Sequence, residues 1–216
     1  MNFAQARTKM VDNQIRTTDV TDLELLRAFL TVPRERFVPE ARRELAYIGA
    51  DVPLGRSRFL MEASPLAKLL QLAQVRSGER ALDVGAGLGY ATAVLAEVGA
   101  SVVALEEDEE LAQRAQEALS ASAAGAWELA RGPLNAGWSA GAPYDVILVE
   151  GSVDRVPQVL FDQLADRGRL VAVIGHGNAG MAKLFVKDGD LVSDRFGFNC
   201  SLKPLPGFVE KPSFAF

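Results

Sequence analysis

Apolar residues between positions 80 and 110 fall into three groups that differ in spacing. Residues 81–84 form an almost continuous apolar run, which is typical of a strand buried in a parallel sheet. Residues 90–98 carry apolar side chains at helical spacing, and residues 101–105 form a second apolar run. The pattern predicts a strand, a turn, a helix and a second strand. In an open α/β sheet, ligands bind where such a strand ends and the turn begins.

The rest of the chain continues this alternation of helices and strands. Helices are expected over residues 2–17, after a cap at Asp22, from a cap at Ser64, and over 156–164; strands at 127–130, 144–149 and 169–174; and a hairpin at 183–187 and 191–198. Residues 46–63 show no sustained period and predict a long loop. The fold class is therefore α/β: a doubly wound, mostly parallel sheet of about seven strands, with an N-terminal helical segment and a C-terminal antiparallel hairpin. The tail from Lys203, rich in Pro and Phe, is expected to lie over the surface.

Three glycines follow the first strand at every second position: Gly85, Gly87 and Gly89. Residues without a Cβ permit positive φ and let a ligand approach the backbone closely. A dinucleotide site usually reads Gly-x-Gly-x-x-Gly, but here the third glycine comes one residue early. Asp83 also places an acid where a pyrophosphate would lie. The turn therefore favours a cationic ligand over a phosphate, while another nucleotide or a purely packing role for the glycines remain alternatives.

An acidic run, residues 106–110, follows the second strand. An acid about 20 residues beyond a glycine turn can accept hydrogen bonds from both ribose hydroxyls. Glu106 is the best placed for this, with Glu107 beside it. Asp108 is expected to cap the next helix, and the acids after it complement the helix dipole.

Composition limits the functional classes. The chain has 216 residues and a formal net charge of −5, which disfavours a sequence-independent nucleic-acid binder. Cys200 is the single cysteine, so an intrachain disulfide is excluded and a reducing, cytoplasmic setting is expected. Neither a signal peptide nor a membrane span is evident. We expect a monomer with one domain, 1–216, in which residues 1–78 supply helices and a loop and residues 79–216 supply the sheet.

Asp83 and the three glycines resemble the first motif of class I S-adenosylmethionine (SAM) methyltransferases. More specific segments extend the resemblance to nearly the whole chain, which is similar to protein-L-isoaspartate O-methyltransferases. They are MVDNQIR at 10–16, VPRERFVP at 32–39, ADVPL at 50–54, and PYDVILV at 143–149 with Pro157 beyond it.

This resemblance implies an enzyme that transfers a methyl group from SAM, leaving S-adenosylhomocysteine, to the carboxylate of L-isoaspartyl residues in damaged peptides or proteins. A carboxylate acceptor is already ionised at neutral pH, so no general base is required. No metal site is expected. The cofactor-binding positions that the resemblance implies are Asp83, Gly85, Ala86, Gly87, Gly89, Glu106, Glu107, Gly132, Pro133, Leu134 and Glu150.

The chain departs from the family at the acceptor loop. The family carries Thr-Ile-Ser-Gln-Pro before the third helix, and its serine belongs to the active site. When the motif is aligned on Pro65, that serine falls on Ala63, and Ser64 is one residue away. Ser64 is either a helix cap or a substitute for the family serine. Arg56 or Arg58 either binds a peptide carboxylate or is solvated at the surface.

A second departure lies in the adenine region. The family has Gly-Asp after the third strand, with the carboxylate on the adenine amine, whereas this chain has Gly132-Pro133. Proline offers no side-chain acceptor, so a weaker cofactor affinity is expected unless Asn135 compensates. His176 is either a ligand contact or a plain loop residue. A methyltransferase for another acceptor, a catalytically idle SAM-binding relative and, more remotely, a dinucleotide-dependent oxidoreductase are the alternative functions.

Overall fold

A computed structural model describes residues 1–208 of the chain and shows one seven-stranded sheet and one two-stranded sheet. The strand order of the large sheet is β5-β4-β3-β6-β7-β8-β9. Its strands are β3 (Arg80–Val84), β4 (Ser101–Glu106), β5 (Trp127–Arg131), β6 (Tyr144–Val153), β7 (Leu164–Ile174), β8 (Met181–Asp188) and β9 (Leu191–Asn199). Strands β3 to β7 run parallel to one another, β8 is antiparallel to β7, and β9 is antiparallel to β8. The predicted fold class and C-terminal hairpin are confirmed.

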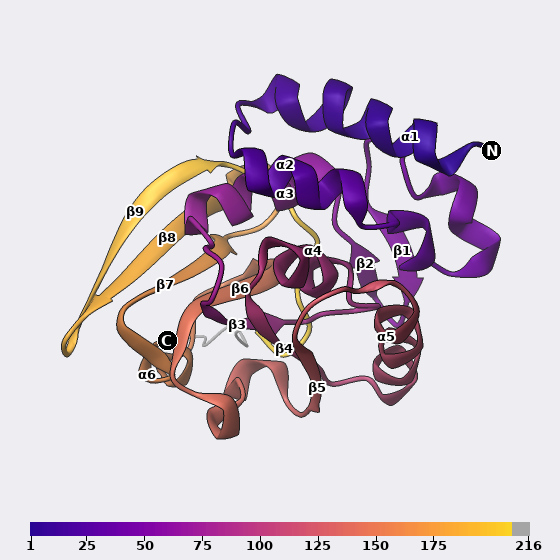
Figure 1. Cartoon of the computed structure of the whole chain (residues 1–216). Coiled ribbons are helices and arrows are strands. Elements are labelled where there is room, and N and C mark those ends of the chain that lie inside the picture. The colour runs from indigo at the N-terminus through magenta and orange to yellow at the C-terminus, as the bar shows by residue number, and fades with distance from the viewer. Residues whose placement is uncertain (209–216) are drawn as a thin grey trace, which may run out of the picture.

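Helices cover the two faces of this sheet unequally. They are α1 (Phe3–Met10), α2 (Leu23–Thr31), α3 (Ala63–Ala73), α4 (Tyr90–Val98), α5 (Glu109–Ser122) and α6 (Gln158–Asp162). Buried side chains of α1 to α5 join one core cluster, whereas α6 and the C-terminal segment join the cluster on the opposite face. Figure 1 shows α1, α2 and α3 lying together and the β8–β9 hairpin extending outward at one edge. The ligand-binding switch point therefore lies between β3 and β6, where the chain turns from one half of the sheet to the other.

The segment 46–63 is not the irregular loop that its sequence predicts. It contains a two-stranded antiparallel hairpin, β1 (Val52–Gly55) and β2 (Arg58–Leu60). Each strand is too short to establish a readable period, and alternate residues of both are buried against the rest of the chain. The hairpin lies over the carboxyl ends of the sheet strands, because Leu54 and Arg58 reach the turn after β3.

Two further predictions of local structure were wrong. Ser64 is the second residue of α3 rather than its cap, and Glu62 occupies the cap position. The helix expected over 156–164 is only the five-residue α6, because β7 already begins at Leu164. By contrast, Asp22 and Asp108 cap α2 and α5 as expected, each through a side-chain oxygen that accepts from a backbone amide.

The C-terminal segment returns over the carboxyl ends of the strands. Ser152 of β6 exchanges backbone hydrogen bonds with Lys203 and Leu205, both of 2.9 Å. Leu205 and Phe208 are buried, so aromatic and aliphatic side chains do fix the described part of the tail. Phe214 and Phe216, to which the same prediction extends, lie outside the described residues. No helix within residues 1–208 is both long and apolar enough to cross a membrane.

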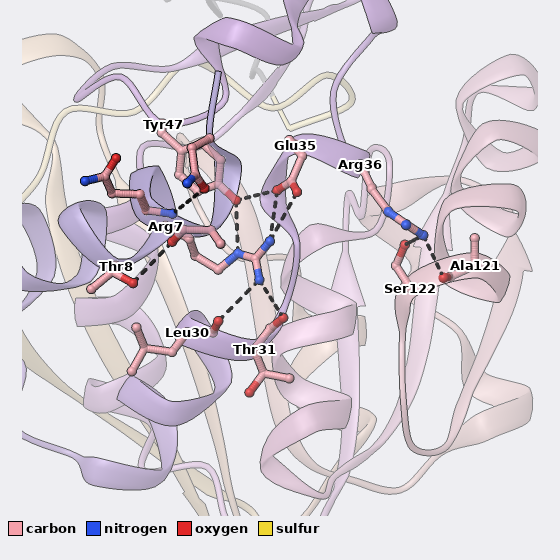
Figure 2. A network of polar contacts seen from close by, with 12 residues as sticks. Arg7, Thr8, Leu30, Thr31, Glu35, Arg36, Tyr47, Ala121 and Ser122 are labelled. Carbon is pink, nitrogen blue, oxygen red and sulfur yellow. Dashed lines mark hydrogen bonds and ion pairs between the residues drawn. The ribbon is translucent and has the colours of Figure 1, made fainter.

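Polar contacts tie the N-terminal helices to the connectors that follow them (Figure 2). Arg7 of α1 donates to Tyr47 Oη and to Glu35 Oε1, both at 3.1 Å, and Tyr47 in turn donates to Glu35. Arg36 donates to the carbonyl of Ala121 at 3.0 Å, near the end of α5. These contacts hold α1 and the segment after α2 in one arrangement beside α5.

Arg34 is the largest fully buried side chain and lies in the same region. Its guanidinium donates to the carbonyl oxygens of Ala46 and Met61 at 2.7 and 2.6 Å and stacks 4.8 Å from the centre of the Tyr90 ring. Arg34 therefore fixes the approach to the β1–β2 hairpin and its exit into α3.

We expect Arg34→Leu to lower the free energy of unfolding by about 3 kcal/mol, because two buried carbonyls lose their donors. Urea denaturation of the two proteins measures the difference. Arg43→Gln, at an exposed ion pair with Glu40, should change stability by less than about 0.5 kcal/mol. Equal stability of Arg34→Leu and the wild type would contradict this assignment.

Candidate functional site

The glycine turn after β3 is built as its sequence predicts. Gly85 and Gly87 have φ values of 86° and 59°, which residues with a Cβ rarely adopt. The amides of Gly85 and Ala86 both donate to the carbonyl of Leu105, so this turn is fastened to the end of β4. Gly89 has a different role: a Cβ there would meet Leu119 at 2.8 Å, so this glycine permits close packing of α4 on α5.

Glu106, at the end of β4, is fully buried beside this turn. One of its carboxylate oxygens accepts from the Gly87 amide at 2.8 Å, and the other accepts from the amides of Glu107 and Asp108 at 3.0 and 3.1 Å. A carboxylate in this position at the switch point is the group that the sequence predicts for ribose binding. The structure therefore brings the glycine turn and Glu106 together.

Arg58 of the hairpin also binds this carboxylate, which the sequence did not indicate. Its Nη1 lies 2.8 and 2.9 Å from the two oxygens of Glu106, and its Nη2 donates to the Gly85 carbonyl at 2.5 Å. Arg58 is only 6% exposed, so the pair is buried. Of the two expectations for Arg56 and Arg58, surface solvation describes Arg56 alone, which forms exposed ion pairs with Asp108 and Glu110.

A second pair of acids lies on the neighbouring strands β3 and β6: Asp83 in β3 and Glu150, which follows the last β6 residue paired with β3. Thr92 donates to Asp83 at 2.6 Å. Burial raises the pKa of Asp83 to about 6, although the hydrogen bond from Thr92 opposes this effect. Burial, followed by the charge of Asp83, raises the pKa of Glu150 well above its ordinary value. The site therefore disfavours ionisation of both acids together.

Two cavities adjoin the buried acids of the site, one beside Glu106 and the other beside Glu150. The larger, of about 380 Å³, lies between the end of β4 and the C-terminal segment and is bordered by Glu106, Glu107 and Leu134. The smaller, of about 20 Å³, is bordered by Phe59, Met61 and Glu150. The first has the surroundings expected for a nucleoside, and the second lies where the predicted acceptor loop meets β6.

The predicted adenine border is only partly assembled around the larger cavity. Leu134 is buried and borders the cavity, whereas Gly132 packs against the Trp138 ring and its amide lies 3.4 Å from the Glu106 carbonyl. Pro133 is exposed. Asn135 donates its side-chain amide to the carbonyl of Gly207 at 3.0 Å, so it holds the C-terminal segment.

The two candidates for the family serine do not border the smaller cavity. Ala63 is buried at the start of α3, and the Ser64 hydroxyl donates to Thr18 Oγ1 at 2.9 Å. Ser64 therefore connects α3 to the N-terminal helices. Met61, two residues earlier than Ala63, is the member of this segment that reaches the cavity.

His176 follows β7 and bridges two polar side chains. Its Nδ1 lies 2.8 Å from Ser152 Oγ, and its Nε2 lies 2.7 Å from Asp154 Oδ1. Ser152 is 1% exposed, and its backbone anchors the C-terminal segment. His176 thus supports the end of β6. Its position after a predicted strand did not indicate this role.

The comparison with known proteins adds a family. A family model described as Protein-L-isoaspartate(D-aspartate) O-methyltransferase (PCMT) matches residues 5–204. The chain belongs to this family. The protein-L-isoaspartate O-methyltransferase 1 of Rhodopseudomonas palustris (strain HaA2) is 40% identical over 174 residues, which are 81% of this chain and 71% of that relative. A relative of the same name from Pelobacter propionicus is 35% identical over 211 residues, 96% of this chain and 98% of that one.

Solved structures agree with this family. A protein-L-isoaspartate O-methyltransferase aligns with a TM-score of 0.79 at 25% identity over 93% of this chain and 66% of that chain. A Plasmodium falciparum protein described under the same activity, in complex with S-adenosyl-L-homocysteine, aligns with a TM-score of 0.79 at 20% identity over 95% of this chain and 98% of that chain. The second likeness shows the fold. Together the comparisons confirm the resemblance that the sequence motifs indicate.

The acid pair predicts an unusual dependence of stability on pH. Both pKa values are raised in the folded state, so the contribution of the pair is greatest in acid and is lost as the pH rises. Glu150→Gln removes one of the two titrating groups and its negative charge beside Asp83. Between about pH 5 and about pH 8, its free energy of unfolding should therefore rise relative to wild type by at least about 1 kcal/mol.

Urea denaturation at several pH values measures this trend, with Glu24→Gln on the exposed side of α2 as the control. The control difference should stay constant over the same range. A constant difference for Glu150→Gln as well would contradict the raised pKa of Glu150.

Proposed function

We propose that the chain transfers a methyl group from SAM to the carboxylate of L-isoaspartyl residues in damaged proteins or peptides, with S-adenosylhomocysteine as the second product. Membership of the family over residues 5–204 is the observation that carries this proposal. The glycine turn and the buried carboxylate of Glu106 support it, because they form a site for a nucleoside without a phosphate.

The residues of the site fit this cofactor. Gly85 and Gly87 add no side chain of their own to the space above the turn, which Arg58 and Leu54 border, and Glu106 is the carboxylate that would accept from ribose hydroxyls in exchange for Arg58. Asp83 and Glu150 place acidic side chains near the methionine end, where the ligand carries its positive charges. When bound, SAM supplies an activated methyl group. The protein orients the acceptor and excludes water.

The acceptor chemistry suits a site without a general base. A carboxylate is ionised at neutral pH and needs only to be held in line with the methyl carbon. Phe59 and Met61 give the smaller cavity apolar walls, which would exclude water from the reacting groups. The proposed binding place of the acceptor carboxylate is beside the cavity that Phe59 and Met61 border.

Further parts of the proposal concern the setting of the protein. We propose a monomeric cytoplasmic enzyme without nucleic-acid partners, which the net charge of −5 and the free, buried Cys200 support. Residues 1–78 and 79–216 would act as one domain, which is supported by the packing of α2 on α4 and of α3 on β7.

Another carboxylate or hydroxyl acceptor is the second candidate. It is favoured by a specific observation: the segment that should carry the family serine presents buried Ala63 and a Ser64 hydroxyl already bonded to Thr18. The same cofactor site would serve either acceptor.

The first test is transfer of labelled methyl groups from SAM to an isoaspartyl peptide, with the aspartyl isomer as the control. We expect selective labelling of the isoaspartyl peptide. If neither peptide is labelled by a folded, SAM-binding protein, the isoaspartyl assignment is excluded and the second candidate remains.

We expect Pro133→Asp to tighten the binding of S-adenosylhomocysteine by about tenfold, because a carboxylate at this position can accept from the adenine amine. Pro133 is exposed with an extended ψ of 127°, so aspartate can replace it without a clash. Isothermal titration calorimetry measures the change. Ala136→Asp adds the same charge three residues later and should leave the affinity unaltered; an equal gain there would show a general charge effect.

A further inference from the structure

Arg58 separates the two cavities of the candidate site. The larger cavity is bordered by Arg58 with Glu106 and Leu134, and the smaller by Arg58 with Met61 and Glu150. Among the residues bordering these two cavities, only Arg58 borders both. A ligand with a nucleoside at one end, a sulfonium between and an amino-acid tail at the other end must extend through the position that this side chain occupies.

The contacts of Arg58 are those that such a ligand needs. Its Nη1 engages both oxygens of Glu106, at 2.8 and 2.9 Å, where ribose hydroxyls would donate. Its Nη2 engages the Gly85 carbonyl at 2.5 Å, in the turn that would hold the ammonium group. The guanidinium therefore reproduces, within the chain, both the charge and the donors of a cationic nucleoside.

The space above the turn is filled by the same side chain. A Cβ on Gly85 would lie 2.9 Å from Arg58 Nη2 and 2.9 Å from Leu205 Cδ1. The space beside Gly85, where a ligand could approach the backbone, is therefore occupied by Arg58 of the hairpin and Leu205 of the C-terminal segment. Arg58 in this position and a bound cofactor exclude each other, because they would occupy the same space and both carry positive charge.

We propose that Arg58 is an internal competitor of the cofactor and sets its affinity: the β1–β2 hairpin closes the site by placing Arg58 on Glu106 and Gly85, and the cofactor binds only when Arg58 leaves. This proposal rests on the proposed function, because it takes the cofactor to be the SAM of that reaction.

The hairpin has weak polar contacts at its turn. It forms a two-stranded sheet of its own, outside the large sheet. Arg56 and Ser57 at its turn have φ values of 53° and 58°, a left-handed conformation that is strained for residues other than glycine. The remaining charged contacts of its turn, from Arg56 to Asp108 and Glu110, are exposed and contribute little. The pair of Arg58 with Glu106 is therefore the main buried polar contact of the hairpin strands, and Arg42 adds an exposed hydrogen bond to the Pro53 carbonyl.

The experiment is calorimetric titration of S-adenosylhomocysteine into the whole chain as wild type, Arg58→Gln and Arg58→Lys. We expect Arg58→Gln to bind about tenfold or more tightly than wild type, since no buried charge pair must be broken first. Arg58→Lys keeps the charge without the two-pronged geometry and should bind with intermediate affinity. Arg27→Gln, at an exposed pair on α2, is the matched control and should bind as wild type does.

The outcomes separate this proposal from the proposed function. Circular dichroism and thermal unfolding first show that both Arg58 variants are folded. If both then bind S-adenosylhomocysteine no more tightly than wild type does, the competitor role is overturned. Binding by the wild type would leave the methyltransferase proposal intact in that case. Binding by the variants without measurable binding by wild type supports the competitor role in its strongest form. Absence of binding in every protein overturns both proposals. If Arg58→Gln does not fold, the comparison of Arg58→Lys with wild type decides.

Discussion

The carboxylate of Glu106 is the point on which the rest of the site depends. It accepts hydrogen bonds from the amide of Gly87 in the glycine turn, from two amides at the start of α5, and from Arg58 of the hairpin. Three segments that are distant in sequence are thereby fixed around one buried charge. A buried carboxylate is tolerated only when it is paired and hydrogen-bonded in this way. Any ligand that binds Glu106 must replace the arginine without losing that compensation.

The charge balance of the site explains which ligands it suits. Asp83, Glu106 and Glu150 lie near one guanidinium, and burial raises the pKa values of Asp83 and Glu150. A phosphate would add negative charge beside these acids, whereas a ligand with ammonium and sulfonium groups would neutralise them. The arginine is a substitute for such a cation. The same acids that favour the cofactor therefore also favour the closed hairpin.

What the sequence predicted correctly is local. The strands around the glycine turn, the caps at Asp22 and Asp108, and the position of Glu106 all follow from the spacing of nearby residues. The pairing of Arg58 with Glu106 spans 48 positions, and no periodic pattern connects them. The hairpin that carries Arg58 was missed because its strands have only four and three residues. Ser64 was misjudged as a cap because Pro65 suits a first helical position, yet α3 begins one residue before Ser64.

Two of the departures of this chain from the family pattern concern recognition of the acceptor and of adenine. The missing serine lies at the acceptor loop, and the missing carboxylate lies after β5 at the adenine border, whereas the glycine turn and Glu106 are kept. Transfer to an ionised carboxylate requires position and exclusion of water, and neither departure removes a group that moves a proton. Differences at these two positions therefore alter how tightly a cofactor or an acceptor is held. They leave intact the geometry at the ends of β3, β4 and β6, where the methyl group would be transferred.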